Sequence, residues 1–186
     1  MILRRALLVL TLLGSCLPTA RAAELAGVRF TDNIAIADQK LVLNGLGLRK
    51  KLFIKVYVAG LYLPAKQTTG AGVLGGDTVR HLEMEFLRGV SAGQLAGAWG
   101  ECLEANRPDA SEQLKADFER LNQGMQDVET KDRMVVTYRP DQGTKVSIRD
   151  RAVAEVEGKA FADALFSCWV GDHPPSEDFK EGLLGN

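Results

Sequence analysis

Residues that bind metals and carry redox chemistry are scarce in this sequence. It has two histidines, His81 and His173, and three cysteines, Cys16, Cys102 and Cys168. The cysteines form no Cys-x-x-Cys pair and the histidines do not cluster with them, whereas a structural zinc site needs several such ligands at close spacing. The sequence therefore gives no support for a metal site, and we expect no cofactor.

An excess of positive charge is also missing. The chain has 23 lysines and arginines against 24 aspartates and glutamates, for a net charge of −1. Proteins that bind nucleic acid usually carry a basic patch or stripe that meets the phosphates. We therefore expect no nucleic-acid partner.

Common catalytic and phosphate-binding motifs are absent as well. Ser91 lacks the Gly-x-Ser-x-Gly context of a nucleophile elbow. The glycine-rich residues 70–76, GAGVLGG, lack the Gly-Lys-Ser/Thr ending and the following helix of a P-loop, so we interpret residues 66–78 as a flexible loop. Glu83 and Glu85 lie two apart on one strand face, and solvated surface acids explain them more simply than glycosidase chemistry does.

The N-terminal segment is too short in its apolar part to cross a bilayer as a helix, which takes about 20 residues. Its apolar stretch, Ala6 to Leu13, is typical of the h-region of a secretory signal peptide. Arg4 and Arg5 precede this stretch as a positive n-region, and the small-x-small cleavage pattern Ala20-Arg21-Ala22 follows it.

We therefore expect residues 1–23 to be a cleaved signal peptide and residues 24–186 to be a mature domain that is periplasmic or otherwise exported. Cleavage after Ala22 removes three arginines and no acid, which leaves 20 basic and 24 acidic residues and a net charge of −4. We expect no stable membrane insertion after cleavage. In the alternative, the loose lipobox Leu13-Gly14-Ser15-Cys16 would give a lipid-anchored protein through Cys16.

The hydrophobic pattern of the mature chain predicts one domain of mixed structure. Residues 28–36 are predicted to be extended with a turn at Asp32-Asn33. Alternating side chains predict further strands at residues 40–46, 52–63, 80–87, 133–139, 144–149 and 152–157, and Gly45 and Gly47 end the first of these. Apolar stripes predict helices that begin at a Ser91/Gln94 capping box and an Asp109/Glu112 capping box, and helices at residues 159–170 and 176–184. Because the strands cluster, an α+β antiparallel sheet with helices on one face and solvent on the other is the natural packing.

The two cysteines of the mature chain both occupy apolar helix positions. Two buried thiols that behave as small hydrophobic groups are the simpler interpretation of Cys102 and Cys168. An exported protein can oxidise such a pair. Whether they form a disulfide stays open, because the geometry of the bond is demanding.

Residues 45–64, GLGLRKKLFIKVYVAGLYLP, resemble the chalcone isomerase superfamily, in the form of its bacterial, non-plant chalcone isomerase-like members that are related to fatty-acid-binding proteins. The sequences RGVS at 88–91, YRP at 138–140 and the closing segment at 161–185 add to the resemblance. It covers nearly the whole mature chain and implies an open-faced β-sandwich with a ligand cleft.

The resemblance implies that Arg49 and Tyr57 bind the ligand. Arg49 matches the arginine with which plant chalcone isomerases polarise their substrate, and Tyr57 falls where those enzymes carry a threonine. In the fatty-acid-binding branch, an arginine and a tyrosine at about these places hold the carboxylate, which suits the planar fork of arginine. From composition alone, Arg49 is instead a solvated charge in a basic turn beside Lys50 and Lys51, and Tyr57 a core or rim aromatic. We place Arg49 on a loop between strands, where binding residues concentrate.

The active plant enzymes also need a tyrosine and an asparagine at the start of the helix that here begins near Ser91. The matching segment, RGVSAGQLAGAWGE, has neither. We therefore expect a non-catalytic module that binds a fatty acid or a similar amphipathic carboxylate in a cleft anchored by Arg49. The alternatives are an intramolecular lyase or isomerase of chalcone isomerase type and an interaction protein whose own side chains fill the cleft. The oligomeric state stays open.

Overall fold

The computed structural model describes residues 22–186. The n-region, the h-region and Cys16 of the expected signal peptide lie outside these residues, so the cleavage and lipobox predictions stay predictions. Within the described part of the chain, no helix has both the length and the apolar character needed to cross a membrane.

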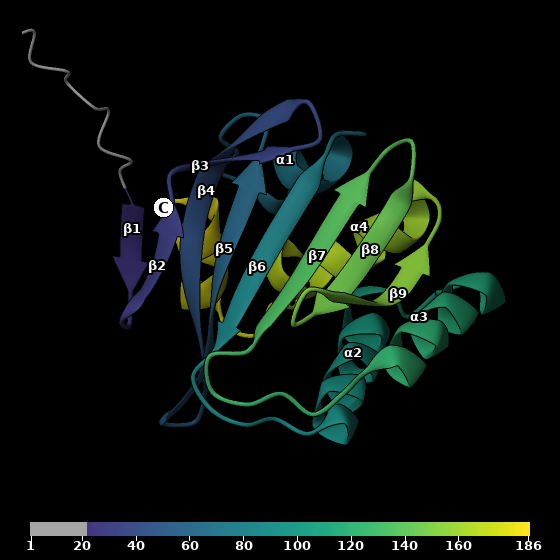
Figure 1. Cartoon of the computed structure of the whole chain (residues 1–186). Helices are drawn as coiled ribbons and strands as arrows, with labels where there is room; N and C mark the ends of the chain where they lie inside the picture. The colour runs from purple at the N-terminus through teal and green to yellow at the C-terminus, as the bar shows by residue number, and fades with distance from the viewer. Residues whose placement is uncertain (1–21) are drawn as a thin grey trace, which may run out of the picture.

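Seven strands form one curled antiparallel sheet in which the strands follow chain order (Figure 1). They are β3 (Asn33–Ile36), β4 (Gln39–Lys51), β5 (Ile54–Leu63), β6 (Arg80–Phe86), β7 (Arg133–Arg139), β8 (Gly143–Ile148) and β9 (Arg151–Val156). A separate hairpin consists of β1 (Ala22–Leu25) and β2 (Val28–Thr31). The predicted antiparallel sheet is confirmed, and β1 is a strand that the sequence did not predict.

The helices are α1 (Gly70–Gly75), α2 (Ala92–Asn106), α3 (Glu112–Gly124), α4 (Lys159–Val170) and α5 (Glu177–Leu184). The loop predicted at residues 66–78 is wrong in part, because the Thr69 side chain accepts a hydrogen bond from the Gly72 amide and so caps α1. The capping box of α2 is confirmed. The cap predicted for α3 is wrong, since Ser111 and not Asp109 accepts from the Leu114 amide.

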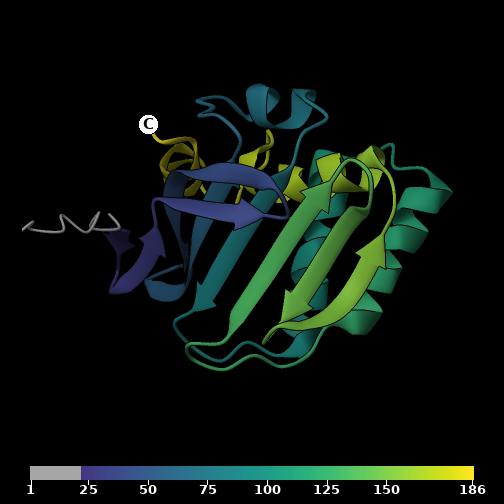
Figure 2. The same ribbon diagram turned by 45° about the horizontal axis from the view of Figure 1, so that its top comes forward.

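The main core lies between the sheet and the helices, which pack on one face of the sheet (Figure 2). Alternate residues of the central strands, such as Leu61, Leu82 and Val136, point into this core and meet Phe118 and Leu165 from the helices. Each is almost fully shielded from solvent, and burial of this kind contributes about 25 cal/mol per Å² of apolar surface. The predicted α+β open-faced β-sandwich is therefore confirmed.

The opposite face of the sheet is partly covered, so the expectation that it faces solvent is wrong for this part. Phe30 of the β1–β2 hairpin packs with Leu41, Val58 and Tyr62 in a second, smaller core. A side chain at Gly60 would place its Cβ 2.7 Å from the Phe30 ring. Glycine at this position therefore leaves the room that the hairpin needs to cover the sheet.

Strand β4 continues five residues past its predicted end, through Gly45 and Gly47 to Lys51. Its glycines do not end the strand but admit α5, since a Cβ at Gly47 would lie 2.8 Å from the Phe179 carbonyl oxygen. The turn predicted to hold Arg49 is therefore wrong, because Arg49 lies within β4. The turn lies instead at residues 52–53, and β5 begins two residues later than predicted.

Candidate functional site

A cavity of about 900 Å³ opens between the sheet and helices α2 and α4, at the end of the sheet where β4 turns into β5. Its volume falls in the range of small-molecule sites. The sheet side is lined by Arg49, Lys51, Leu52, Ile54, Val56, Tyr57, Met84, Phe86 and Met134. The helical side is lined by residues 88–90 before α2, by the α2 face from Gln94 to Ala105, by Cys168 and Trp169 of α4, and by residues 173–175.

Strand pairing brings Arg49 and Tyr57 together. The two residues are directly opposite each other in the β4–β5 register. Opposite residues of an antiparallel pair project from the same face, with Cβ atoms about 4.5–5.5 Å apart. Both line the cavity, so the structure places the two predicted ligand-binding residues at one site.

The half-buried guanidinium of Arg49 is fixed along one edge. Its Nη1 donates to the carbonyl of Lys50 at 2.7 Å and to the carbonyl of Pro175 at 3.0 Å. Within residues 22–186, no carboxylate forms an ion pair with Arg49, and no protein group accepts from its Nε or Nη2. The side chain is therefore held in place by two carbonyls and keeps charged donors for a further partner.

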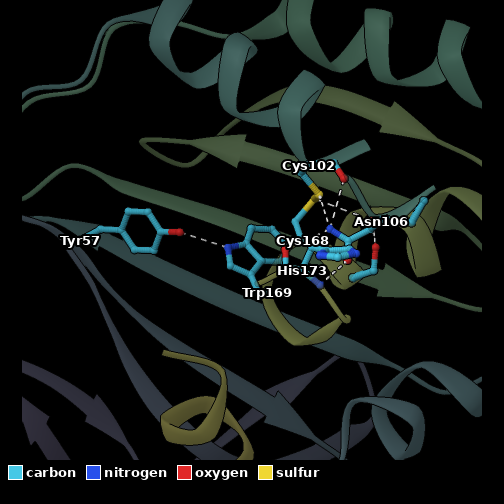
Figure 3. Close-up of a disulfide and its surroundings, with 8 residues drawn as sticks. Tyr57, Cys102, Asn106, Cys168, Trp169 and His173 are labelled. Atoms are coloured by element: carbon cyan, nitrogen blue, oxygen red, sulfur yellow. Dashed lines mark hydrogen bonds between the residues drawn. A yellow bond between two sulfur atoms is a disulfide. The ribbon is translucent and has the colours of Figure 1, made fainter. Parts of the chain in front are cut away.

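The hydroxyl of Tyr57 accepts a hydrogen bond from Nε1 of Trp169 at 3.2 Å (Figure 3). Because the indole only donates, the phenol proton stays free to be donated elsewhere. Burial raises the pKa of Tyr57, although the hydrogen bond from Trp169 and the charge of Arg49 act against this rise. The phenol is therefore neutral at physiological pH and remains a donor.

A disulfide between Cys102 and Cys168 joins α2 to α4 at the cavity wall (Figure 3). The Cα atoms are 5.4 Å apart, within the range that the bond requires. The interpretation of two buried free thiols is therefore wrong. Periodicity placed both residues on apolar helix faces but carried no information on which helices lie side by side.

The segment that joins α4 to α5 is held against the cavity at two points. The Asn106 side chain donates to the His173 carbonyl at 3.1 Å and accepts from the His173 amide at 3.0 Å. Two residues later, Pro175 accepts from Arg49. This segment therefore forms a fixed wall beside the arginine, and neither its course nor these contacts could be read from the sequence.

The polar groups of the cavity favour an anion. Arg49, Lys51 and Arg88 are its cationic side chains, against the single carboxylate of Glu101. On the α2 wall, Gln94 is the amide side chain, and its oxygen already accepts from the Ser91 amide in the capping box. Within the described residues, no group of three histidine, cysteine or acidic side chains is placed to hold a metal ion.

Sequence reasoning missed Trp169 as a partner of Tyr57. Trp169 belongs to an apolar α4 stripe whose other members, apart from Cys168, lie in the core, and only 1% of it is exposed. Its ring packs edge-on against Trp99 of α2 at 5.5 Å. A helical stripe gives the same signal for a core residue and for a residue at a cavity, so the pattern could not have identified it.

Both a family model and a solved structure are similar to this chain. A family model described as chalcone isomerase-like matches residues 22–185. A similar solved structure is that of a fatty-acid binding protein from Arabidopsis thaliana, with a TM-score of 0.67 and 17% identity over 88% of this chain and 96% of that chain. No curated protein matches the sequence. The likeness of structure shows a shared fold, and the bacterial branch of the family remains a prediction. Since the family model spans nearly all of the described residues, the chain belongs to the chalcone isomerase-like family.

Proposed function

We propose that this protein binds a fatty acid or a similar amphipathic carboxylate in the cavity and catalyses no reaction on it. One observation carries the proposal: Arg49 and Tyr57 are paired at the cavity, each with donors that no described residue uses. The Arabidopsis protein of the same fold, which is named as a fatty-acid binding protein, supports the choice of ligand.

The head group of the ligand would be held by three donors. The free edge of the Arg49 guanidinium gives two parallel charge-assisted hydrogen bonds to a carboxylate. The Tyr57 hydroxyl gives a third, and the bond that it accepts from Trp169 orients it. The charge-assisted bonds from Arg49 together stabilise the complex by about 1.5–3 kcal/mol, and the neutral Tyr57 donor contributes about 0.5–1.5 kcal/mol.

The tail of the ligand would lie against the apolar lining. Val56, Met84 and Phe86 supply it from the sheet, and Leu95 and Trp99 supply it from α2. Each methylene removed from water contributes about 0.8 kcal/mol, so a long chain would supply most of the affinity. A site that combines charged donors for the head group with an apolar lining for the tail favours an amphipathic carboxylate over a small polar anion.

The isomerase alternative lacks support on the α2 wall. There the cavity meets Val90, Gly97 and Ala98, where the resemblance calls for tyrosine and asparagine donors. Cyclisation of a chalcone needs an organised donor network around the substrate carbonyl. Arg49 and Tyr57 supply one side of such a network, and Val90, Gly97 and Ala98 carry no side-chain donor where the resemblance calls for tyrosine and asparagine.

The Cys102–Cys168 disulfide supports export as part of the same proposal. Disulfides form and persist in oxidising compartments such as the bacterial periplasm and are rare in the cytosol. A mature domain in the periplasm or another exported location would keep the bond that joins α2 to α4.

Titration of the purified domain with a fluorescent long-chain fatty acid tests the proposal. We expect Arg49→Ala to weaken binding by about 1.5–3 kcal/mol, and Arg49→Lys to recover only part of this loss because an ammonium lacks the planar fork. Arg151→Ala, which removes an exposed arginine at the start of β9, is the matched control and should leave affinity unchanged.

Thermal unfolding of each variant must accompany the titration, because Arg49 also holds the Pro175 carbonyl. Equal affinity in the parent and in a folded Arg49→Ala protein would show that Arg49 does not bind the head group of the ligand. Arg49-dependent cyclisation of a chalcone above the uncatalysed rate would replace the proposal with the isomerase alternative.

A further inference from the structure

The hairpin tip, which we define as residues 50–55, exposes apolar side chains to solvent. Phe53 is 99% exposed, Leu52 86% and Ile54 49%, and they are the large hydrophobic side chains that stand out as exposed in the described part of the chain. In Figure 1 the turn between β4 and β5 extends past the adjoining ends of β6 and β7. Among residues 22–186, the Phe53 side chain therefore has almost no packing partner.

Lysines surround this apolar apex. Lys50, Lys51 and Lys55 are all exposed, and within residues 22–186 none of them forms an ion pair. Lys50 and Lys55 are directly opposite each other in the β4–β5 register. Like charges in opposite positions destabilise a strand pair, so the tip carries a repulsion that a negative surface would relieve.

The turn itself is built from residues that do not favour it. Leu52 has a φ of 56°, in the left-handed region that favours glycine, asparagine and aspartate. Tight hairpin turns usually carry such residues, whereas this one carries Leu-Phe. Stability of the hairpin therefore does not account for the sequence at its apex, and departures of this kind are expected at functional positions.

We propose that the hairpin tip docks the protein on a bilayer surface that contains anionic phospholipid. Phe53, Leu52 and Ile54 enter the boundary between head groups and acyl chains, and the flanking lysines meet the phosphates. Aromatic and aliphatic side chains bordered by lysine are the composition that binds this boundary.

A protein partner fits the hairpin tip less well than a bilayer does. Stable protein interfaces bury about 800 Å² on each partner and are depleted of lysine at their centre. Three apolar residues at the apex of a hairpin, bordered by lysines, offer neither this area nor this composition. A bilayer requires no such matching surface.

The hairpin tip is continuous with the cavity, because Lys51, Leu52 and Ile54 also line it. Docking at the tip places the opening of the cavity against the bilayer, which contains the acyl chains. This link to ligand transfer rests on the proposed function, whereas the docking surface stands on the hairpin alone.

Co-sedimentation with vesicles, in the absence of fatty acid, tests the docking. The vesicles are either pure phosphatidylcholine or equal parts phosphatidylcholine and phosphatidylglycerol. We expect the protein to sediment with the anionic vesicles, weakly with the zwitterionic ones, and less in high salt. Phe53→Ser and the pair Lys50→Gln with Lys55→Gln should each weaken binding about tenfold.

Controls separate the hairpin tip from the rest of the protein. The matched control is the double variant Lys40→Gln with Lys145→Gln, which removes one exposed lysine from the start of β4 and one from β8. This variant should bind vesicles as the parent does. Phe53→Trp should show a blue shift of tryptophan emission on anionic vesicles, since Trp99 and Trp169 are buried beforehand. None of these positions lines the cavity, so fatty-acid titration in solution should give the parent affinity for all of them.

Three results would overturn the proposal: no sedimentation with either vesicle, sedimentation that Phe53→Ser leaves unchanged, or a self-association that Phe53→Ser abolishes. The last would assign the tip to a contact between copies of the chain. Loss of fatty-acid binding in Arg49→Ala with vesicle binding intact would leave both proposals standing. If vesicle binding fails while fatty-acid binding is normal, the docking proposal is wrong and the proposal for the cavity stands.

Discussion

Tyr57 shows how one residue takes its role from its neighbours. Its ring is wedged edge-on between Phe86 and Phe179, with centroids 5.6 Å and 5.9 Å away. Its hydroxyl is occupied as an acceptor by Trp169 and is kept neutral by burial. The sequence left open whether Tyr57 is a core aromatic or a ligand contact, and the structure gives it features of both.

Replacement of Tyr57 by phenylalanine isolates the contribution of the hydroxyl. We expect Tyr57→Phe to weaken fatty-acid binding by about 0.5–1.5 kcal/mol, less than Arg49→Ala, because a neutral donor is lost while the ring stays in place. The lost acceptor also leaves the Trp169 indole N–H without its partner, so a small loss of stability should accompany the change. Isothermal titration and thermal unfolding measure the two effects, and a larger loss of affinity than in Arg49→Ala would contradict this order.

The residues of the site differ in how far the sequence could predict them. Arg49 and Tyr57 were predicted from a family resemblance, whereas their opposition across β4 and β5 depends on a register shift between Arg49 and Lys50 that leaves no sequence signal. Trp169 could not be assigned, because its apolar stripe looks the same whether the helix meets core or cavity. A contact between side chains that are far apart in the sequence, such as that between Trp169 and Tyr57, can be identified only from the folded structure.

Helix α2 forms the cavity wall with small residues. Gly97 and Ala98 face the cavity, and a Cβ at Gly97 would have no heavy atom within 4 Å. Glycine inside a helix costs about 0.5–1 kcal/mol relative to alanine. The helix therefore gives up stability at a position where the small residue keeps the cavity open.

Filling the cavity from α2 should block the ligand without unfolding the protein. We expect Gly97→Leu to weaken fatty-acid binding by about 2 kcal/mol, the contribution of two to three buried methylenes, and to leave the unfolding temperature equal or higher. Gly100→Leu, which adds the same side chain on α2 away from the cavity lining, is the matched control. Full affinity in Gly97→Leu would place the tail of the ligand elsewhere.

The disulfide fixes α2 relative to α4 and closes a loop of 66 residues. We expect Cys102→Ser to lower the free energy of unfolding by about 2–4 kcal/mol, because the unfolded chain regains the entropy that the bond removed. Cys168→Ser and the double variant should show the same loss, since each removes the same single bond. Urea denaturation measures it, and an unchanged midpoint in the serine variants would show that the bond does not form in solution.

The elements themselves were largely predictable, and two of the exceptions share one cause. Strands β5 to β9 and helices α2 to α5 follow hydrophobic periodicity. Helix α1 and the second half of β4 were missed because glycine in these segments indicates a loop or an end. Tertiary contact overrides this preference, since Val73 anchors α1 in the core and α5 packs on the glycines of β4.

At the scale of the whole molecule, the first testable feature is where the mature chain begins. We expect protein recovered from the cell envelope to start near Ala23, because the Ala-x-Ala pattern follows a short apolar h-region. Edman degradation or intact mass measures this start. A lipid-modified N-terminus at Cys16 would contradict it and indicate a permanent anchor in place of reversible docking through the hairpin tip.

The packing of α5 on β4 sets the order in which the molecule can assemble. The side chain of Asn44 in β4 donates to the carbonyl of Leu183 in α5 at 2.7 Å, across 139 residues of sequence. While residues 177–184 are still inside the ribosome, β4 has no helix to cover it, and contacts of such long range form slowly even afterwards. The core therefore stays incomplete until residues 177–184 have left the ribosome. For the export that we propose, a chain that is still open at that stage is in the state that a translocase needs in order to thread it through a membrane.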